Sequence, residues 1–240
     1  MPTSRRSWDS FEAMRQAAQA GDPQAQCYLG VCYQTGQGVE LDYPEAVKWF
    51  RRAADQNDPV AQCYLGVSYL HGMGVPQEYG EAAKWLREAG EQGDPAAQFN
   101  LGVLYETGQG VPQNYAEAVK WYRKSAQHGY PAAQFNLGVF YETGQVVPQN
   151  FTEAVRWYRA AAEQDCAPAQ CNLGLCYQIG RGVPPDRLEA VKWFIRAARQ
   201  GDKTAQHNLG LHYAEMEIKE AEAAAAAEDA AAKDAAEAGL

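Results

Sequence analysis

The sequence predicts an all-α fold, a solenoid of stacked antiparallel helix pairs, and three observations support this prediction. Leu-Gly pairs recur at a constant step of 36 residues, beginning at Leu29, Leu65, Leu101, Leu137, Leu173 and Leu209. Five of the six tryptophans keep the same step, at Trp49, Trp85, Trp121, Trp157 and Trp193. Within each copy, apolar residues recur at three- and four-residue intervals, the spacing of one face of an α-helix. A strict period of this length is typical of solenoids, whose units pack on their neighbours.

Each copy is expected to open with a first helix, such as residues 95–107. Asp94 precedes Pro95, which favours a helix start because the carboxylate accepts from free N–H groups and proline in the first turn loses no helix bond. The aspartate recurs at Asp22 and Asp58, whereas later copies have Tyr130 and Cys166 at this position. Those two later copies are predicted to have weaker helix starts. A left-handed glycine is expected to end the first helices at positions 36, 72, 108, 144 and 180.

A second helix is expected over segments such as residues 115–127. Its apolar face is formed by Ala118, Trp121, Tyr122, Ser125 and Ala126. Glu117 and Lys120 lie one turn apart on the other side, and the same charge pair recurs in the other full copies. This charge ladder is either an outer docking face or a solvated convex surface, and the solvated surface is the simpler interpretation.

The glycine of each Leu-Gly pair lies inside a predicted helix, where glycine costs about 0.5–1 kcal/mol relative to alanine. Close approach of a neighbouring helix would offset this cost if a large ring filled the space. We expect the tryptophan of a second helix to be that ring, and stacking on a ligand is the alternative role for the tryptophans. Val146 stands where other copies have the second loop glycine, so we expect it to strain or reshape its loop.

Three segments are expected along the chain. Residues 1–21 form an N-terminal capping helix, residues 22–213 form the repeat solenoid, and residues 214–240 form a C-terminal helical extension rich in alanine and glutamate. The solenoid contains five full repeats and a sixth first helix. The extension carries eight acidic residues and two lysines, so it accounts for −6 of the net charge of −9. The rest of the chain is near neutral, with its charges interspersed.

The charge pattern excludes two classes of partner. Nucleic acids and anionic membrane surfaces attract clustered lysine and arginine, and the sequence has no such cluster. No segment approaches the ~20 apolar residues that a membrane span needs, and no apolar run typical of a secretory signal follows the N-terminal arginines. We therefore expect a soluble protein, most simply a cytoplasmic one.

The run GDPAAQFNLGVLYETGQGVPQNYAEAVKWYRKSAQHG, at residues 93–129, resembles the Sel1-like repeat, a relative of the tetratricopeptide repeat with a longer, glycine-rich loop. The resemblance extends over roughly residues 9–213. It implies a right-handed α-solenoid that serves as an adaptor or scaffold, in signalling and in contacts between bacterium and host. Some relatives have been described as β-lactamases or penicillin-binding proteins, and this chain lacks the nucleophile motif for that activity.

The sequence contains few residues in patterns typical of a catalytic or metal-binding site. Cys27, Cys63 and Cys171 share one repeat position, and Cys32 and Cys176 share another, which is unlike a set of disulfide staples. We interpret the cysteines as reduced packing residues. The five-residue spacing of His207 and His212 is poor for a metal site, and no Ser-x-x-Lys, Gly-x-Ser-x-Gly or phosphate-loop motif is present. We therefore expect no catalytic residue, no metal site and no cofactor.

A binding surface is expected on the concave side, which the first helices line. One flank of these helices varies most between copies, and variation is expected where residues recognise a partner rather than repeat a core. The candidate contact residues on this flank are Tyr28, Tyr64, Ser68, His71, Asn100, Leu104, Asn136, Phe140, Asn172, Asn208 and His212. An asparagine amide both donates and accepts, so the four asparagines could hold a peptide backbone, or they could bond to adjacent repeats or water.

These observations predict a non-enzymatic adaptor that binds a partner protein or peptide along the concave face. A small-molecule or glycan binder, or an enzyme using the same groove, is one alternative. A self-assembling structural element, which associates through the C-terminal helix, is another.

Overall fold

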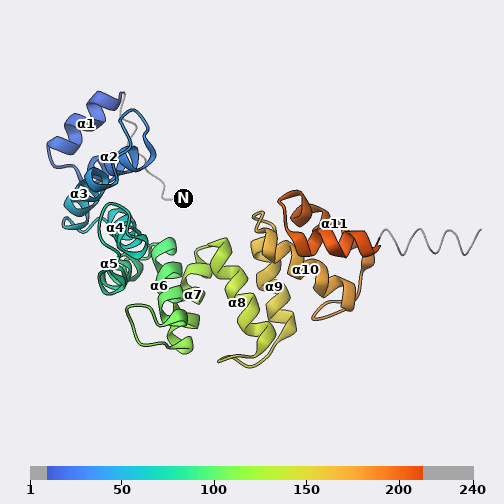
Figure 1. The fold of residues 1–240 in the computed structure, drawn as a ribbon. Coiled ribbons are helices and arrows are strands. Elements are labelled where there is room, and N and C mark those ends of the chain that lie inside the picture. The colour runs from blue at the N-terminus through green and yellow to red at the C-terminus, as the bar shows by residue number, and fades with distance from the viewer. Residues whose placement is uncertain (1–9, 213–240) are drawn as a thin grey trace, which may run out of the picture. The chain divides into compact units, whose positions relative to one another are not determined.

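The computed structural model describes residues 10–212, and within this range all regular secondary structure is helical (Figure 1). The chain divides into two compact units, Met1–Pro148 and Gln149–Leu240, and each is considered by itself. The first unit contains α1 (Phe11–Gln19), α2 (Pro23–Thr35), α3 (Tyr43–Ala54), α4 (Pro59–His71), α5 (Tyr79–Glu91), α6 (Pro95–Thr107), α7 (Tyr115–Gln127) and α8 (Pro131–Thr143). The second contains α9 (Phe151–Ala162), α10 (Ala167–Ile179), α11 (Arg187–Arg199) and a further helical segment at residues 203–212.

Within each unit, consecutive helices pack against one another, so the all-α solenoid of paired helices is confirmed. We call α2, α4, α6, α8 and α10 the first helices, and α3, α5, α7, α9 and α11 the second helices. Within the segment expected to cap the solenoid, the structure describes α1, which packs on α2. The proposed extension at residues 214–240 lies outside the described residues. None of the helices between residues 10 and 212 is long and apolar enough to cross a membrane.

The first helices begin and end as their sequences predict. A carboxylate oxygen of Asp94 accepts from the backbone N–H of Ala97 at 2.7 Å. The same cap joins Asp22 to Ala25 at 2.9 Å and Asp58 to Ala61 at 2.8 Å. Tyr130 and Cys166 provide no side-chain cap, as expected for weaker starts. Each of the five first helices ends at a left-handed glycine, with φ of 75° at Gly108.

The second helices bury the face that the sequence indicates. On α7 the buried residues include Ala118, Trp121, Tyr122, Ser125 and Ala126. The opposite side carries exposed ion pairs one turn apart, with N–O distances of 2.7 Å for Lys48–Glu45, 2.5 Å for Lys120–Glu117, 3.4 Å for Arg156–Glu153 and 3.3 Å for Lys192–Glu189. Because such exposed pairs contribute little to stability, the packed face holds these helices in place.

The ring that covers the Leu-Gly glycine is not the tryptophan, so that expectation was wrong. A Cβ on Gly30 would lie 2.6 Å from the Phe50 ring, and one on Gly102 would lie 2.7 Å from the Tyr122 ring. Leu86 and Phe194 take the same place over Gly66 and Gly174. Each of these side chains directly follows the tryptophan of its copy. Successive residues on a helix point about 100° apart, so the two side chains face different neighbours.

The tryptophan instead joins one repeat to the preceding one. Trp85 of α5 belongs to a buried cluster with Phe50 of α3 and Leu65 of α4. Trp121 of α7 packs in the same way with Leu86 of α5 and Leu101 of α6. The helices α5 and α7 therefore each place two large side chains in the core, one against their own first helix and one in the cluster shared with the repeat before it.

A row of buried glutamines adds a polar connection between helices. The side-chain N–H of Gln98, at the start of α6, donates to the Gly90 carbonyl near the end of α5 at 2.9 Å. Equivalent bonds run from Gln26 to Ala18, from Gln62 to Ala54, from Gln134 to Ala126 and from Gln170 to Ala162. Each bond gives a second donor to a carbonyl in the last turn of the preceding helix, which also accepts from a backbone N–H of the turn that follows.

Val146 has a left-handed backbone, with φ of 69°. The equivalent glycines of other copies approach a neighbouring backbone closely: a Cβ on Gly74 or Gly110 would lie 2.3 Å from the carbonyl oxygen of Tyr43 or Tyr79. A β-branched residue is unfavourable in this conformation. The predicted strain at Val146 is therefore confirmed.

Candidate partner-binding site

The expected contact residues divide between the two units. Those of the first unit are Tyr28, Tyr64, Ser68, His71, Asn100, Leu104, Asn136 and Phe140, all on first helices. Asn172, Asn208 and His212 belong to the second unit. We call the surface formed by α2, α4, α6 and α8 the first-helix face, and the site is described there.

One of the variable positions belongs to the core. Ser68, Leu104 and Phe140 are equivalent residues of successive copies, and their exposed fractions are 1%, 0% and 4%. The Ser68 hydroxyl donates to the Tyr64 carbonyl at 2.8 Å, Leu104 lies in the buried cluster around α6, and the Phe140 ring packs on Tyr122. Variation at this position therefore accompanies differences in packing, and does not by itself indicate recognition.

The position of Tyr28, Tyr64, Asn100 and Asn136 is accessible. Tyr28 is 45% exposed and the other three side chains are partly exposed. The Tyr64 ring stacks on Phe50, with 4.9 Å between centroids and 8° between planes. Burial of part of this ring raises the pKa of the Tyr64 hydroxyl. The exposed His71 lies at the end of α4.

The two asparagines of the first unit are held differently. The Asn100 amide donates to the Ala96 carbonyl of its own helix at 2.9 Å. The Asn136 amide interacts with the Tyr122 hydroxyl and opposes the rise in its pKa, an effect that burial outweighs. The Asn100 amide therefore has a structural role, which agrees for this residue with the alternative in which the asparagines bond within the solenoid.

Tyr122 and Glu106 form a hydrogen-bonded pair that the sequence analysis missed. The fully buried Tyr122 side chain donates from its hydroxyl to Oε2 of Glu106 at 2.5 Å. Burial, and then the bond to the carboxylate, raise the pKa of Tyr122 well above its ordinary value. The tyrosine therefore stays neutral and donates at every physiological pH.

A signal for this pair exists in the repeat pattern. Glu106 precedes Tyr122 by 16 residues, and Glu142 and Tyr158 have the same residue types at the same spacing. Copies with an apolar residue at the tyrosine position have no glutamate: Gln34 with Phe50, Leu70 with Leu86, and Gln178 with Phe194. A buried hydroxyl needs an acceptor, whereas phenylalanine and leucine do not.

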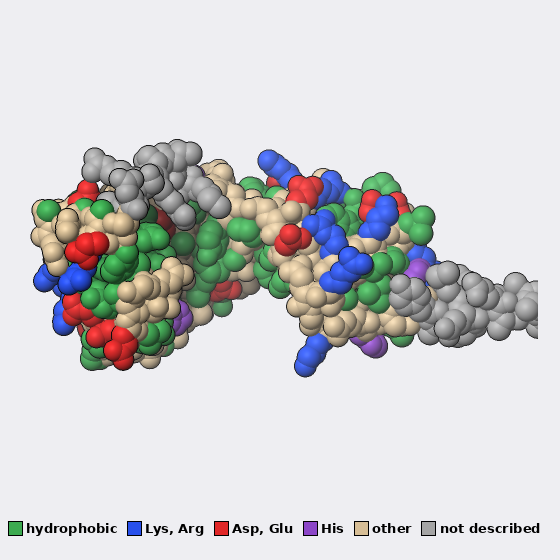
Figure 2. Space-filling model, turned by 90° about the horizontal axis from the view of Figure 1, so that it is seen from above, with side chains coloured by type: hydrophobic (Ala, Val, Ile, Leu, Met, Phe, Trp, Pro, Cys, Tyr) green, Lys and Arg blue, Asp and Glu red, His purple; other side chains and the backbone are tan. Residues whose placement is uncertain are grey.

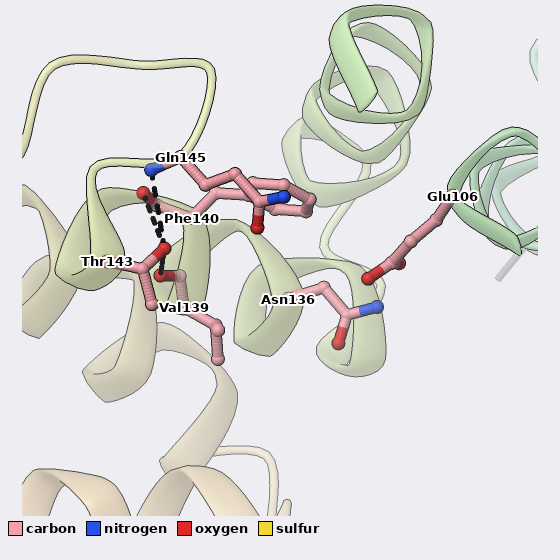
Figure 3. Close-up of a pocket in the computed structure, with 6 residues that line it drawn as sticks. All are labelled: Glu106, Asn136, Val139, Phe140, Thr143 and Gln145. Carbon is pink, nitrogen blue, oxygen red and sulfur yellow. Dashed lines mark hydrogen bonds between the residues drawn. The ribbon is translucent and has the colours of Figure 1, made fainter. Parts of the chain in front are cut away.

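A small hollow is lined by two of the expected contact residues, Asn136 and Phe140, and by Glu106, which was not expected. It has a volume of about 60 Å³ and is lined by Glu106 from α6 and by Asn136, Val139, Phe140, Thr143 and Gln145 from α8 and the loop after it (Figure 3). The Glu106 carboxylate faces the Asn136 amide (Figure 3). The Thr143 hydroxyl, which also lines the hollow, donates to the Val139 carbonyl of its own helix at 2.9 Å. Ligand pockets for small molecules usually measure about 300–1,000 Å³, so this hollow suits one side-chain group rather than a metabolite.

A wider hollow of about 570 Å³ lies over the starts of α2 and α4 and includes Asp22, Gln56, Asn57 and Asp58 among its lining residues. Both aspartates already cap helices there. Partial burial raises the pKa of Asp58, which outweighs the opposing effect of its bonds from backbone N–H groups. The two carboxylates of this hollow therefore serve the helix starts.

The buried cysteines lack the features of catalytic nucleophiles. Five are buried, and none of the six, all within residues 10–212, forms a disulfide. Burial is the main cause that raises the pKa of Cys27, Cys63 and Cys171, that of Cys171 to about 12. A thiol with a raised pKa is poorly ionised and is therefore a poor nucleophile.

The histidines do not assemble a metal site either. The Arg187 side chain donates to Nδ1 of His212 at 2.9 Å. Among the described residues, no three histidine, cysteine, aspartate or glutamate side chains lie close enough together to hold a metal ion.

The repeat pattern and the helix pairs define a solenoid repeat protein. The sequence matches the Sel1 repeat at residues 23–58, 59–94, 95–130, 131–166 and 167–202. The chain therefore belongs to the Sel1 repeat family. Such repeats typically form non-catalytic scaffolds for protein interaction.

Solved structures give the same result. The chain is similar to a Sel1 repeat protein from Oxalobacter formigenes, with a TM-score of 0.77 and 39% identity over 85% of this chain and 90% of that one. It is also similar to c5321, a protective antigen present in uropathogenic Escherichia coli strains, with a TM-score of 0.78 and 35% identity over 86% of this chain. It spans 45% of the c5321 chain.

A more distant likeness is to an immunity protein from Pseudomonas aeruginosa. The TM-score is 0.54 and the identity 22%, over 85% of this chain and 78% of that one, so this likeness concerns the fold alone. A comparison with curated proteins found no match.

Proposed function

We propose that this chain is a non-enzymatic adaptor that binds a segment of a partner protein along the first-helix face. The observation that carries the proposal is that the side chains at one repeat position are solvent-accessible and differ from copy to copy. Tyr28, Tyr64, Asn100 and Asn136 are all accessible and differ between copies, while the core around them repeats. A core must repeat because each copy packs in the same way, but a recognition surface need not.

The fold and the chemistry support an adaptor over an enzyme. The groups around the hollow include one carboxylate and neutral amides, and the hollow is too small for most metabolites. Six cysteines that form no disulfide are typical of a protein in a reducing compartment, so we propose that the adaptor acts in the cytoplasm. In the second unit, the proposed contact residues are Asn172, Asn208 and His212. Self-association through residues 214–240 concerns residues that the structure does not describe.

The test uses the full chain as bait in a lysate, with quantitative mass spectrometry of the captured proteins. A face variant combines Tyr28→Ala, His71→Ala and Asn100→Ala, one change on each of α2, α4 and α6. A matched control combines Lys48→Ala, Lys84→Ala and Lys120→Ala, three exposed residues on second helices. We expect the face variant to lose the captured proteins and the control to keep them, with similar thermal unfolding of both. Retention of the same proteins by the face variant would show that binding occurs elsewhere.

A further inference from the structure

The lysines and arginines within α2 to α8 all lie on the second helices. The first helices α2, α4, α6 and α8 contain no lysine or arginine, and their acidic residues are Glu106 and Glu142. The second helices α3, α5 and α7 carry Lys48, Arg51, Arg52, Lys84, Arg87, Lys120, Arg123 and Lys124. Figure 2 shows one face of the molecule, on which basic and acidic side chains are both present. The first-helix face therefore favours a cationic partner over an anionic one.

Glu106 has no basic partner among the described residues. Its Oε2 accepts from the Tyr122 hydroxyl, and a carboxylate has room for several more donors. The nearest arginines along the repeat are engaged elsewhere: Arg87 donates to the Tyr105 hydroxyl at 3.1 Å and Arg123 to the Tyr141 hydroxyl at 3.3 Å. The half-buried Glu106 carboxylate thus lines the hollow and can accept further hydrogen bonds.

The other walls of the hollow suit a flat cationic group. Asn136 supplies an amide beside the carboxylate, and Gln145 supplies another across the hollow. Val139, which is partly exposed, supplies an apolar wall against which a methylene stem can lie. A guanidinium group presents five donors in one plane and pairs with carboxylates through two parallel bonds. An ammonium group can use fewer of these features.

We propose that this hollow between α6 and α8 is a socket for an arginine side chain of the partner, whose guanidinium pairs with Glu106 beside Asn136 and whose methylene stem lies against Val139. The inference rests on the proposed function, because it assumes that a partner segment lies along the first-helix face. It adds the chemistry of that segment, which must contain an arginine.

The test measures binding of fluorescent nonapeptide pools to the full chain by fluorescence polarisation. The central residue is fixed as arginine, lysine, glutamine or glutamate, and the other positions are randomised among uncharged residues. We expect the arginine pool to bind about tenfold more tightly than the glutamine pool, as for a hydrogen bond to a charged group. The lysine pool should fall between them, and the glutamate pool should bind most weakly.

Three variants assign the preference to the hollow. Glu106→Gln keeps an acceptor for Tyr122 but removes the charge, and it should abolish the arginine preference. Tyr122→Phe keeps the carboxylate and should retain the preference, so a general disturbance of the hollow is separated from loss of charge. Glu117→Gln, at an exposed ion pair on α7, is the matched control and should behave as the unchanged chain.

The outcomes separate the two proposals. Equal binding of the arginine and glutamine pools, lysine binding as tight as arginine, or a preference that survives Glu106→Gln would each overturn the arginine socket while leaving the adaptor in place. If the face variant loses its captured proteins but the socket fails these tests, the adaptor stands with a different recognition chemistry. If no pool binds and the face variant keeps every captured protein, both proposals are wrong.

Discussion

A Cβ placed on Gly102 would lie 2.7 Å from Cε1 of the Tyr122 ring. This close approach lets α7 pack directly on the backbone of α6, and it positions the Tyr122 hydroxyl beside Glu106. The glycine therefore supports both the packing of the repeat and one wall of the proposed socket.

Gly102→Ala should destabilise the protein by about 1–3 kcal/mol, because an added methyl group must displace a buried ring. Urea unfolding monitored by circular dichroism measures the change. Gly80→Ala is the matched control, since a Cβ at Gly80 within α5 would meet no atom within 4 Å. That control should stabilise the protein by about 0.5–1 kcal/mol through helix propensity. Equal effects of the two substitutions would contradict the packing role of Gly102.

Val146→Gly should stabilise the protein by about 1 kcal/mol, because glycine adopts the left-handed backbone without the strain of a branched side chain. The shift in thermal midpoint by calorimetry measures this. Val147→Gly, one residue further on, has no positive φ to relieve and should destabilise instead. A loss of stability in Val146→Gly would mean that side-chain contacts of Val146 outweigh the backbone strain.

Gln98→Met should cost about 0.5–1.5 kcal/mol, because it removes the side-chain hydrogen bond to the Gly90 carbonyl, which keeps only its bond from the Gly93 backbone N–H. The same change removes the contact between Gln98 and Nδ1 of His128 at 3.2 Å. Gln24→Met, at an exposed position of α2, should leave the free energy of unfolding nearly unchanged. Denaturant titrations of both variants give the comparison, and a neutral Gln98→Met would contradict a stabilising role for the buried glutamine row.

Alkylation by iodoacetamide should modify Cys166 first, because it is the one cysteine that is not buried. An ordinary thiol ionises as the pH rises to about 9, but burial holds the pKa of Cys171 at about 12 and raises those of Cys27 and Cys63. Raising the pH from about 7 to 9 should therefore leave the buried thiols of the folded protein unreactive.

Mass spectrometry of tryptic peptides identifies the modified thiols. Cys166→Ser should remove the rapid reaction, and unfolding in urea should expose all six cysteines. Rapid modification of Cys27, Cys63 or Cys171 in the folded chain would contradict their burial.

Local features were predictable because neighbouring residues decide them. The helix at Pro95–Thr107 and the helix at Tyr115–Gln127 have the expected bounds, since capping, glycine conformation and apolar spacing act within a few residues. The candidate site was predicted less well. Variation between copies identified Asn136 and Phe140, which do line the hollow, but it also selected Leu104 and Ser68, which are buried.

The sequence by itself determined the repeat, its helix boundaries and the family, because these depend on periodicity and on short-range backbone preferences. The tertiary structure decided which side chain covers Gly102, which residues are accessible on the first-helix face, and that Glu106 meets Tyr122. These relationships depend on how far one helix is rotated against another. A rotation of a few tens of degrees exchanges a buried neighbour for an exposed one, and residue spacing within a helix does not specify it.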